Sequence, residues 1–303
     1  MKKLSIVIPV YNGALTISTL VEEVFKVITT YELEIILVND GSKDNSEDVC
    51  EKLAAAKKVK FISLRKNFGE HNAVMCGLNY STGDYVAIID DDFQNPPNEI
   101  LNLVTEAEKG FDVVYSKYKI KNHHFFRNIG SKINDFVATS LLSKPKNLYL
   151  SSFKVIRKEV VDEIIKYRGP FPYIDGLLLR VTRNISSVFV EHNARQEGKS
   201  NYTFQKLLSL YFNMFFNFSI KPLRIFTISG AIIFLIGILL SIYFAIDLML
   251  HPNIPAGWTS VIVAILTFSG FQTMFIGLLG EYLGKQYLDQ NGTPQWVVKK
   301  EIL

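Results

Sequence analysis

The segment Tyr85–Pro97, YVAIIDDDFQNPP, decides the fold that this sequence predicts. Its first five residues form an apolar run of the length of a buried strand, and three consecutive aspartates follow where the strand ends. Because alternate residues of an extended segment point the same way, Asp90, Asp92 and Gln94 can converge on one ion. Carboxylate and amide oxygens suit a hard divalent cation that also binds phosphate oxygens. We therefore expect Mg²⁺ or Mn²⁺ here, rather than a solvated acidic turn.

Apolar runs of similar length lie on both sides of this segment. Strands are predicted at Leu4–Val10, Leu33–Val38, Val59–Leu64, Tyr85–Ile89 and Val113–Tyr115. Amphipathic helices are predicted between them, near Leu15–Thr29, Ser46–Ala56, His71–Tyr80 and Glu99–Glu108. Strands that alternate with helices at this spacing indicate βαβ units, and therefore an α/β, Rossmann-like domain with a largely parallel sheet. Ligands of such sheets bind beyond the carboxyl ends of the strands.

Two further polar segments, PVYNG at 9–13 and NDGSKDNS at 39–46, follow the first two predicted strands. No GxGxxG or GxxxxGK[ST] pattern is present, so a dinucleotide site and a P-loop lose support. Tyr11 has a ring that can stack on a nucleobase, and the turn at Gly41 leaves the Asp40 carboxylate free to accept from a base or ribose. We therefore expect a nucleotide pocket beside the metal and a diphosphate, lined by Pro9, Tyr11, Asn12, Asp40, Asp90 and Asp91.

Charge is distributed unevenly along the 303 residues. The block Ile225–Gly284 contains none of the 33 Lys and Arg residues, and its only acids are Asp247 and Glu281. Two uncharged stretches in it, Ile225–Ile246 and Thr259–Gly280, are long enough as helices to cross the ~30 Å hydrocarbon core of a bilayer. Two buried core helices would need a larger soluble shell than this third of the chain supplies.

The net charge of +4 is too small and scattered to indicate nucleic acid, and two cysteines without CxxC spacing support neither a zinc ribbon nor a disulfide framework.

These features predict four parts of the chain. Residues 1–200 form the α/β domain, and 201–224, rich in aromatic residues, form an amphipathic juxtamembrane segment, with a helix packed on the α/β domain as the alternative. Residues 225–284 hold two transmembrane helices, about 225–247 and 259–281, and 285–303 form a tail. Lys and Arg flank the pair on its outer sides and are absent from the connecting loop, so both termini are expected in the cytoplasm. Glycines at 270, 277 and 280 permit close helix approach and hence a homo-oligomer.

The order of motifs resembles a known family. VIPVYNG, VNDGS, NFGEHNAVMCGL and STGDYVAIIDDDFQNPPNEI, followed by EGKSNYTFQKL and FIGLLGEYLGKQY, resemble the family 2 glycosyltransferases of the GT-A fold. Within that family the chain is similar to the polyprenyl-phosphate glycosyltransferases, which include undecaprenyl-phosphate 4-deoxy-4-formamido-L-arabinose transferases, bactoprenol glucosyltransferases and dolichol-phosphate mannose synthases. The resemblance covers almost the whole chain, and the ordered set of motifs with the membrane hairpin carries it.

The resemblance implies roles for individual positions. It implies that Pro9, Tyr11 and Asp40 bind the base and the ribose. It implies that Asp90, Asp92 and Gln94 bind the metal and the diphosphate. The residue between the two aspartates, Asp91, is often Ala in relatives. The acceptor phosphate is expected to bind Lys117, Arg127, Ser131, Arg195 and Ser200, of which Arg127 and Ser131 share one helix face. The residues expected to carry catalysis are Asp92, Arg127, Ser131 and Arg195.

One departure concerns a base. Many relatives carry an acid before the Phe of a GDF-like segment, where this chain has Ser151-Ser152-Phe153 and so lacks that acid. A lipid monophosphate has a second pKa of about 6, as phosphoserine does, so it arrives largely deprotonated. Positioning and stabilisation of the leaving group therefore matter more than proton abstraction.

The activity that the resemblance implies is an inverting transfer. A sugar would move from a nucleotide sugar, expected to be a UDP-sugar with GDP left open, to a polyprenyl phosphate, expected to be undecaprenyl phosphate. This would occur at the cytoplasmic face of a bacterial inner membrane, in modification of cell-envelope glycan or lipopolysaccharide.

Three rival interpretations carry less weight. A processive polysaccharide synthase shares the core, but the QxxRW segment is absent and two spans are too few for a polymer channel. A non-catalytic membrane-bound scaffold would not need Asp40 and the aspartate motif intact. The adjacent pair His123-His124 does not easily converge on one metal ion and is interpreted as part of a polar loop.

Overall fold

The structure is a computed structural model of the chain. It describes residues 1–56, 59–118, 145, 148–191, 193 and 257–303, together with single positions between 228 and 246. The chain divides into two compact units, Met1–Thr203 with Asn291–Leu303, and Phe204–Gln290.

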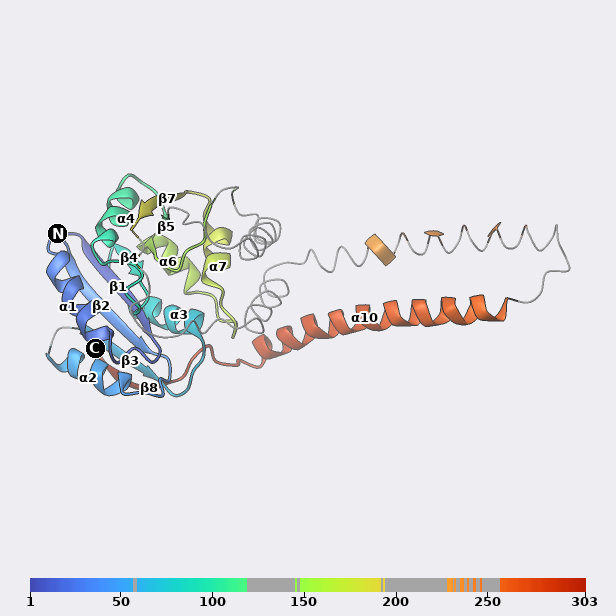
Figure 1. The fold of residues 1–303 in the computed structure, drawn as a ribbon, viewed down its shortest axis with the longest axis horizontal. Helices are drawn as coiled ribbons and strands as arrows, with labels where there is room; N and C mark the ends of the chain where they lie inside the picture. The colour runs from blue at the N-terminus through green and yellow to red at the C-terminus, as the bar shows by residue number, and fades with distance from the viewer. Residues whose placement is uncertain are drawn as a thin grey trace. The chain divides into compact units, whose positions relative to one another are not determined.

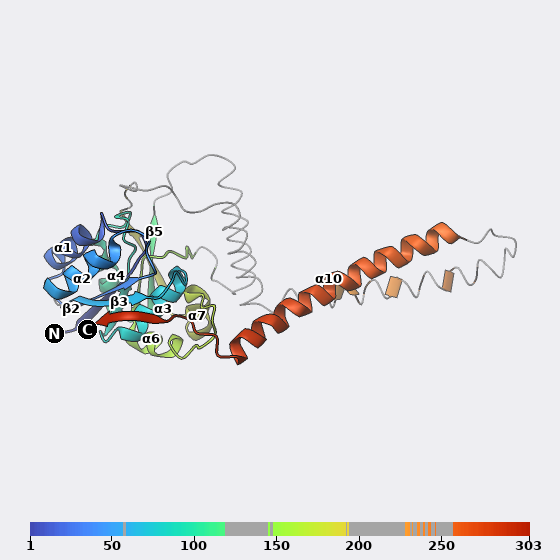
Figure 2. The ribbon, with the colours of Figure 1, turned by 90° about the horizontal axis from the view of Figure 1, so that it is seen from below.

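Among the described residues, the first unit is built on a mixed eight-stranded sheet (Figures 1 and 2). Its strands are β1 (Lys3–Val10), β2 (Glu32–Asn39), β3 (Val59–Leu64), β4 (Tyr85–Ile88), β5 (Val113–Tyr118), β6 (Lys154–Arg157), β7 (Ile185–Val190) and β8 (Val298–Ile302). Their order across the sheet is β7-β5-β6-β4-β1-β2-β3-β8. Only β6 and β8 run against the other six, so the sheet is largely parallel, as predicted.

Helices cover both faces of this sheet. On one face, α1 (Ile17–Val27), α2 (Ser46–Ala56) and α4 (Glu99–Glu108) pack over the side chains of alternate strand residues, including Leu4, Ile6 and Ile8. On the other face lie α3 (Glu70–Tyr80), α6 (Lys158–Ile164) and α7 (Ile174–Val181). Strands covered on both sides must be apolar at every position, which explains why the sequence shows continuous runs instead of alternation.

The last strand changes the interpretation of the C-terminal residues. Instead of a tail throughout, the chain after residue 290 returns to the first unit, and β8 pairs antiparallel with β3. Side-chain contacts also hold β8 in place: Tyr80 Oη donates to Glu301 Oε2 at 2.6 Å, and Lys299 pairs with Glu47 at 2.9 Å. Both chain ends consequently lie on the same side of this unit in Figures 1 and 2. A polar, lysine-rich strand on a sheet edge has no apolar pattern by which the sequence could predict it.

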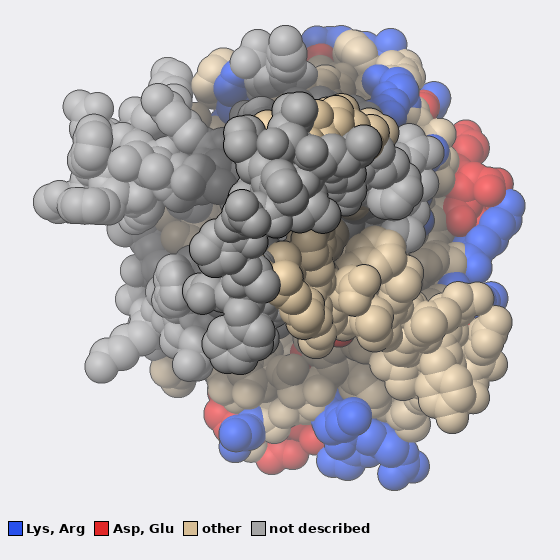
Figure 3. Space-filling view, turned by 90° about the vertical axis from the view of Figure 1, so that its right-hand side faces the viewer, with Lys and Arg blue, Asp and Glu red and all other residues tan. Residues whose placement is uncertain are grey.

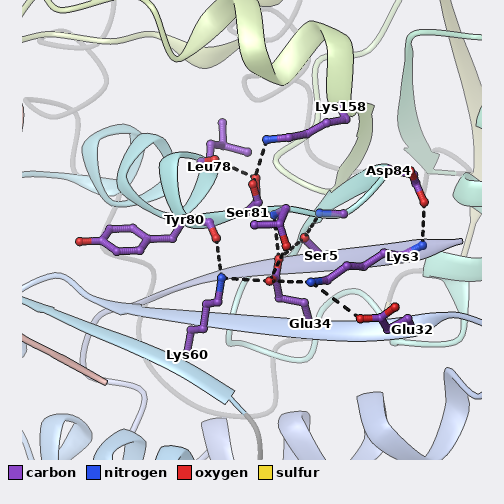
Figure 4. Close-up of polar contacts among 12 residues, drawn as sticks. Lys3, Ser5, Glu32, Glu34, Lys60, Leu78, Tyr80, Ser81, Asp84 and Lys158 are labelled. Atoms are coloured by element: carbon purple, nitrogen blue, oxygen red, sulfur yellow. Dashed lines mark hydrogen bonds and ion pairs between the residues drawn. The ribbon is translucent and has the colours of Figure 1, made fainter. Parts of the chain in front are cut away.

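A buried carboxylate, that of Glu34, lies at the amino-terminal ends of the parallel strands (Figure 4). Glu34 of β2 accepts from Ser5 Oγ at 2.5 Å and from the Thr82 backbone at 2.8 Å, and Lys3 and Lys60 pair with it at 3.2 and 3.0 Å. Burial alone would raise the pKa of Glu34, but these hydrogen bonds and the two ammonium groups outweigh it and hold the pKa at about 2. The network stabilises the fold and lies away from the edge described below.

The surface charge is mixed. In Figure 3 the Lys and Arg side chains of the visible face form several separate groups at its rim, and some lie beside Asp and Glu. Exposed pairs of this kind, such as Lys2 with Glu108 at 3.0 Å, contribute little to stability, because water screens the charges.

The second unit contains α10 (Trp258–Gln290), and the described positions between 228 and 246 are also helical. The second predicted transmembrane stretch, Thr259–Gly280, falls within α10. The first, Ile225–Ile246, and the juxtamembrane segment 201–224 lie mostly or wholly outside the described residues. Among the helices that the structure describes, none combines the length and the apolar character that crossing a membrane requires.

Candidate functional site

The carboxyl ends of the parallel strands bring the predicted segments to one edge of the sheet. Pro9 pairs with Val38 in neighbouring strands, and the Asp40 amide donates to the Val10 carbonyl at 2.9 Å. On the other side of β1, the end of β4 at Ile88 is level with Val7. The loops after β1, β2 and β4 therefore emerge side by side, as the βαβ pattern predicted.

The aspartate segment turns sharply after β4. Ser152, which precedes β6, donates from its Oγ to Asp90 Oδ2 at 2.6 Å. Asp92 Oδ1 accepts from the Gln94 backbone N–H at 3.1 Å. Phe93 between them has a φ of 58°, in the left-handed region that a bulky residue rarely adopts. A strained backbone beside charged groups is typical of functional sites, and here it lies between Asp92 and Gln94.

Asp91 points away from its two neighbours. A Cβ built on Gly13, in the loop after β1, would lie 2.0 Å from Asp91 Oδ2, so only glycine permits this approach. The Gly13 backbone N–H donates to Ser46 Oγ at the start of α2 at 2.9 Å, so Asp91 lies on the α1 and α2 side of the sheet. Burial first, and then the negative charges of Asp91 and Asp44, raise the pKa of the Cys50 thiol in α2 to about 12. Asp90 and Asp92 instead influence Glu70, on the α3 side. The structure thus separates Asp91 from the pair, and its nucleotide-binding role stays a prediction.

The donor set of Asp90, Asp92 and Gln94 fits a hard divalent cation chemically, since all three offer oxygen. The part of the chain that the structure describes contains no group of three or more His, Cys, Asp or Glu side chains able to hold a metal ion. The set contains only two carboxylates and one amide. Such a cation would therefore depend on oxygens from a bound diphosphate or water to complete its shell.

The loops after β1 and β2 are joined to one another. The Asn12 backbone N–H donates to Ser42 Oγ at 3.0 Å, and Asn12 Oδ1 accepts from the Lys43 N–H at 2.8 Å. Asn12 has a φ of 57°, which Asn tolerates better than most residues. Tyr11 beside it is 37% exposed, so its ring is accessible from solvent. Asn12 thus holds the loop in shape and Tyr11 is accessible, and the binding of a nucleotide by these two residues stays a prediction.

Asp40 is not free, contrary to the prediction from its turn. Its carboxylate is buried and accepts from the backbone N–H groups of Phe68 at 2.7 Å and Gly69 at 2.9 Å. Burial raises the pKa of Asp40, and the two hydrogen bonds oppose that rise. The β3–α3 loop comes this close because Gly41, with a φ of +61°, admits it: a Cβ there would lie 2.4 Å from the Lys66 carbonyl carbon. Asp40 therefore anchors the NFG loop, and its role towards a base or ribose stays a prediction.

Lys117 lies near the carboxyl end of β5, on the same side of the sheet as Tyr115. Its Nζ is 5.1 Å from the centre of the Phe189 ring. The β5–β6 pairing continues past Tyr115 and Lys154, since the Ser116 amide donates to the Phe153 carbonyl at 3.1 Å. Lys117 lies one residue beyond this bond, where β5 pairs with β7 at Phe189. The other predicted phosphate-binding residues, Arg127, Ser131, Arg195 and Ser200, lie outside the described residues.

The two serines at the position of the absent acid have separate partners. Ser152 donates to Asp90, whereas Ser151 is buried and accepts from Ser116 Oγ at 2.7 Å. Tyr118 joins this group at 3.0 Å from Ser151, and donates to Asn95 Oδ1 at 2.8 Å. This network of hydroxyl groups ties the DDDFQNPP loop to β5 and β6. It supplies hydrogen bonds but no base.

A buried ion pair that the sequence did not predict lies beneath the aspartates. Lys154, only 3% exposed, pairs with Asp175 of α7, and Tyr115 Oη donates to the same carboxylate at 2.9 Å. Lys154 is level with Ile88 of β4 and Tyr115 of β5, and its Nζ is 5.0 Å from the Tyr115 ring centre. In the sequence FKVIRK it looks like an ordinary surface lysine, and no spacing rule relates it to an aspartate in another element.

This arrangement, a largely parallel sheet with an acidic loop at its carboxyl edge, has solved counterparts. The chain is similar to glucosyl-3-phosphoglycerate synthase from Mycobacterium tuberculosis, with a TM-score of 0.54 and 19% identity over 70% of this chain and 77% of that one. That enzyme was crystallised with Mn²⁺, UDP and glucosyl-3-phosphoglycerate. The likeness assigns the GT-A fold to this chain, as predicted.

Sequence comparison gives the family. The profile of Glycosyl transferase family 2 matches residues 5–165. The undecaprenyl-phosphate 4-deoxy-4-formamido-L-arabinose transferase of Serratia proteamaculans is 34% identical, and that of Proteus mirabilis 32% identical, each over 100% of this chain and 94% of the relative. The chain therefore belongs to glycosyltransferase family 2 and is a glycosyltransferase, which confirms the resemblance drawn from its motifs.

Proposed function

We propose that this enzyme transfers a sugar from a UDP-sugar to undecaprenyl phosphate, with inversion at the anomeric carbon. The observation that carries the proposal is that the loops after β1, β2 and β4, the last of which contains Asp90 and Asp92, emerge side by side at the carboxyl ends of the parallel strands. Support for the acceptor comes from relatives named for undecaprenyl phosphate that match along the full chain. Support for UDP comes from the solved structures of the same fold that contain it.

In this proposal the chain positions the two reactants. The donor lies along the carboxyl edge, with its base near Tyr11 and its diphosphate near Asp90, Asp92 and Gln94. Mg²⁺ or Mn²⁺ on these oxygens supplies Lewis-acid stabilisation of charge on the diphosphate. Lys117 orients the acceptor phosphate, with Arg127, Ser131, Arg195 and Ser200 as the further predicted phosphate ligands.

The chemical step needs no base from the protein. An oxygen of the lipid phosphate forms a bond to the anomeric carbon, while the bond from that carbon to the diphosphate oxygen breaks. The electron pair of that bond leaves with the nucleoside diphosphate. Because a phosphate monoester is largely a dianion at neutral pH, no proton has to be removed first. This agrees with the presence of Ser151 and Ser152 where many relatives have an acid.

The membrane is the second part of the proposal. The apolar stretches 225–247 and 259–281 would form a transmembrane hairpin of a bacterial inner membrane, with the catalytic unit and both termini in the cytoplasm. Its support is the sequence: no Lys or Arg occurs from Ile225 to Gly284. A water-insoluble acceptor requires the active site to remain at the bilayer, and the hairpin would hold it there.

A transfer assay tests this function. Purified full-length protein in detergent would be given undecaprenyl phosphate, Mn²⁺ and a panel of labelled UDP- and GDP-sugars, and label would be measured in the extracted lipid. We expect one UDP-sugar to label the lipid, and omission of undecaprenyl phosphate to abolish the product. A scaffold without activity would label no lipid with any donor.

A further inference from the structure

Glu70 begins α3 at the carboxyl edge of the sheet. The two backbone N–H groups before it, from Phe68 and Gly69, donate to Asp40 at 2.7 and 2.9 Å. These bonds fix the start of α3 against the end of β2. Its position is therefore set by the same loops that form the candidate donor site.

The first turn of α3 also contacts the segment that leads into α7. His71 packs edge-on against Tyr173, with ring centres 5.1 Å apart, and Asn72 Nδ2 donates to the Pro170 carbonyl at 3.5 Å. Asp175 follows in the first turn of α7. Glu70 thus stands among elements that come together from β2, β4, β6 and α7.

Four charged groups act on the Glu70 carboxylate. The pKa of Glu70 is raised to about 7, first because surrounding protein atoms displace part of the water around the carboxyl group and next because of the negative charge of Asp90; Asp175 and Asp92 add to the rise, while Lys154 opposes it. Glu70 itself is exposed, whereas the residues after it in α3, from 72 to 78, are buried. The side chain therefore reaches solvent from the middle of the charged group.

Among the described residues, the cation that acts on Glu70 already has an acidic partner. Lys154 is buried in its pair with Asp175, and Tyr115 occupies the same carboxylate. Within the described part of the chain, Glu70 makes no hydrogen bond and no ion pair of its own. Its oxygens are therefore available to a ligand.

The charge balance indicates which part of the donor such a ligand would be. With Lys154 and Asp175 cancelling, Asp90 and Asp92 leave two negative charges, which a divalent cation offsets, and Glu70 adds a third when it is ionised. A diphosphate adds further negative charge, so Glu70 would repel it. The base and ribose of the donor also carry N–H and O–H groups, but the proposed function places the base near Tyr11. The part of the donor beyond the diphosphate that can donate hydrogen bonds to this carboxylate is the sugar.

We propose that Glu70 is a specificity residue that accepts hydrogen bonds from hydroxyl or amino groups of the donor sugar. This rests on the proposed function, because it requires a nucleotide sugar at the carboxyl edge. Asp40 positions Glu70 through its hydrogen bonds to the backbone of Phe68 and Gly69. The positive charge of Lys154 offsets part of the negative charge around Glu70. Side-chain chemistry at Glu70 then determines which sugars are accepted.

Binding measurements separate this role from the alternatives. Full-length wild type, Glu70→Gln and Glu70→Ala would be titrated in detergent with Mn²⁺ and either UDP alone or UDP-glucose, UDP-galactose and UDP-N-acetylglucosamine. Glu159→Gln is the matched control, because Glu159 is an exposed glutamate in the first turn of α6. Thermal unfolding of each variant reports folding.

We expect Glu70→Ala to weaken the tightest-binding UDP-sugar about tenfold or more, as loss of a charge-assisted hydrogen bond does, and to leave UDP within twofold. Glu70→Gln should lose less and change the ranking of the sugars, and Glu159→Gln should match wild type. Equal losses for UDP and UDP-sugar would make Glu70 a metal ligand or a structural residue and overturn the proposal, as would unchanged sugar binding. Failure of the wild type to transfer any sugar to lipid would instead refute the proposed function, since these titrations need no acceptor.

Discussion

The Glu34 network at the amino edge of the sheet makes a quantitative prediction about pH and stability. Its pKa is about 2 in the fold, against an ordinary value of 4.5. That difference corresponds to about 3 kcal/mol of stability at neutral pH. Because Lys3 and Lys60 are 30% and 26% exposed, we discount this for solvent screening to about 2 kcal/mol. Glu34→Gln should therefore lower the unfolding temperature at pH 7 by about 4–8 °C.

The sign of the pH dependence follows from the lowered pKa. A group whose pKa falls on folding stabilises the fold fully above its unfolded pKa, and loses that contribution as pH falls towards the folded value. The gap between wild type and Glu34→Gln should be constant from pH 7 to about 5 and close between pH 4.5 and 2.

Thermal unfolding of the full chain in detergent, measured across this pH range, checks the prediction. Glu32→Gln is the control, since Glu32 is on the same strand but 65% exposed and 3.9 Å from Lys3. Other carboxylates titrate in every variant, so the difference between proteins is the informative quantity. A gap that stays the same at pH 3 and pH 7, or one equally large for Glu32→Gln, would refute the reasoning.

Three further predictions concern the site. Asp92→Asn keeps the side-chain oxygen that accepts from the Gln94 N–H but removes the negative charge. Sugar transfer in a lipid-labelling assay should therefore fall at least about 100-fold, while the unfolding temperature stays unchanged. Substantial remaining activity would contradict the role of Asp92 as a metal ligand. Removing metal with EDTA should abolish transfer and added Mn²⁺ should restore it, whereas transfer that persists in EDTA would exclude the cation. Gly41→Ala should destabilise the fold by about 1–3 kcal/mol in thermal unfolding, because its φ of +61° and its 2.4 Å approach to Lys66 exclude a Cβ, and an unchanged protein would contradict this packing.

The parts of the site that the sequence predicts well are those that depend on local periodicity. Apolar runs place Pro9, Asp40 and Asp90 at strand ends, and parallel strands bring their ends together without further information. The alternation expected of an extended segment does not apply to the aspartates, because Asp91 and Asp92 lie in a turn. The fold and the position of the site follow from the apolar periodicity and the parallel strands.

Contacts between distant segments account for what was missed. The Asp40 carboxylate was expected to be free of protein contacts, because a DG turn carries no information about distant segments. A loop 28 residues further along the chain donates two backbone N–H groups to it. The Lys154–Asp175 pair joins a strand to a helix through burial that no local pattern encodes. β8 pairs with β3 across more than two hundred residues, and its polar sequence carries no strand signal.

The central claim is that this glycosyltransferase moves a sugar onto a lipid phosphate, and one measurement tests it most directly. Purified enzyme, undecaprenyl phosphate, Mn²⁺ and the best UDP-sugar of the panel would be incubated, and the lipid product and the released UDP would be quantified together. The account predicts one UDP for each lipid-linked sugar, with the anomeric configuration inverted. UDP release without sugar in the lipid, or a product that retains the configuration, would contradict it.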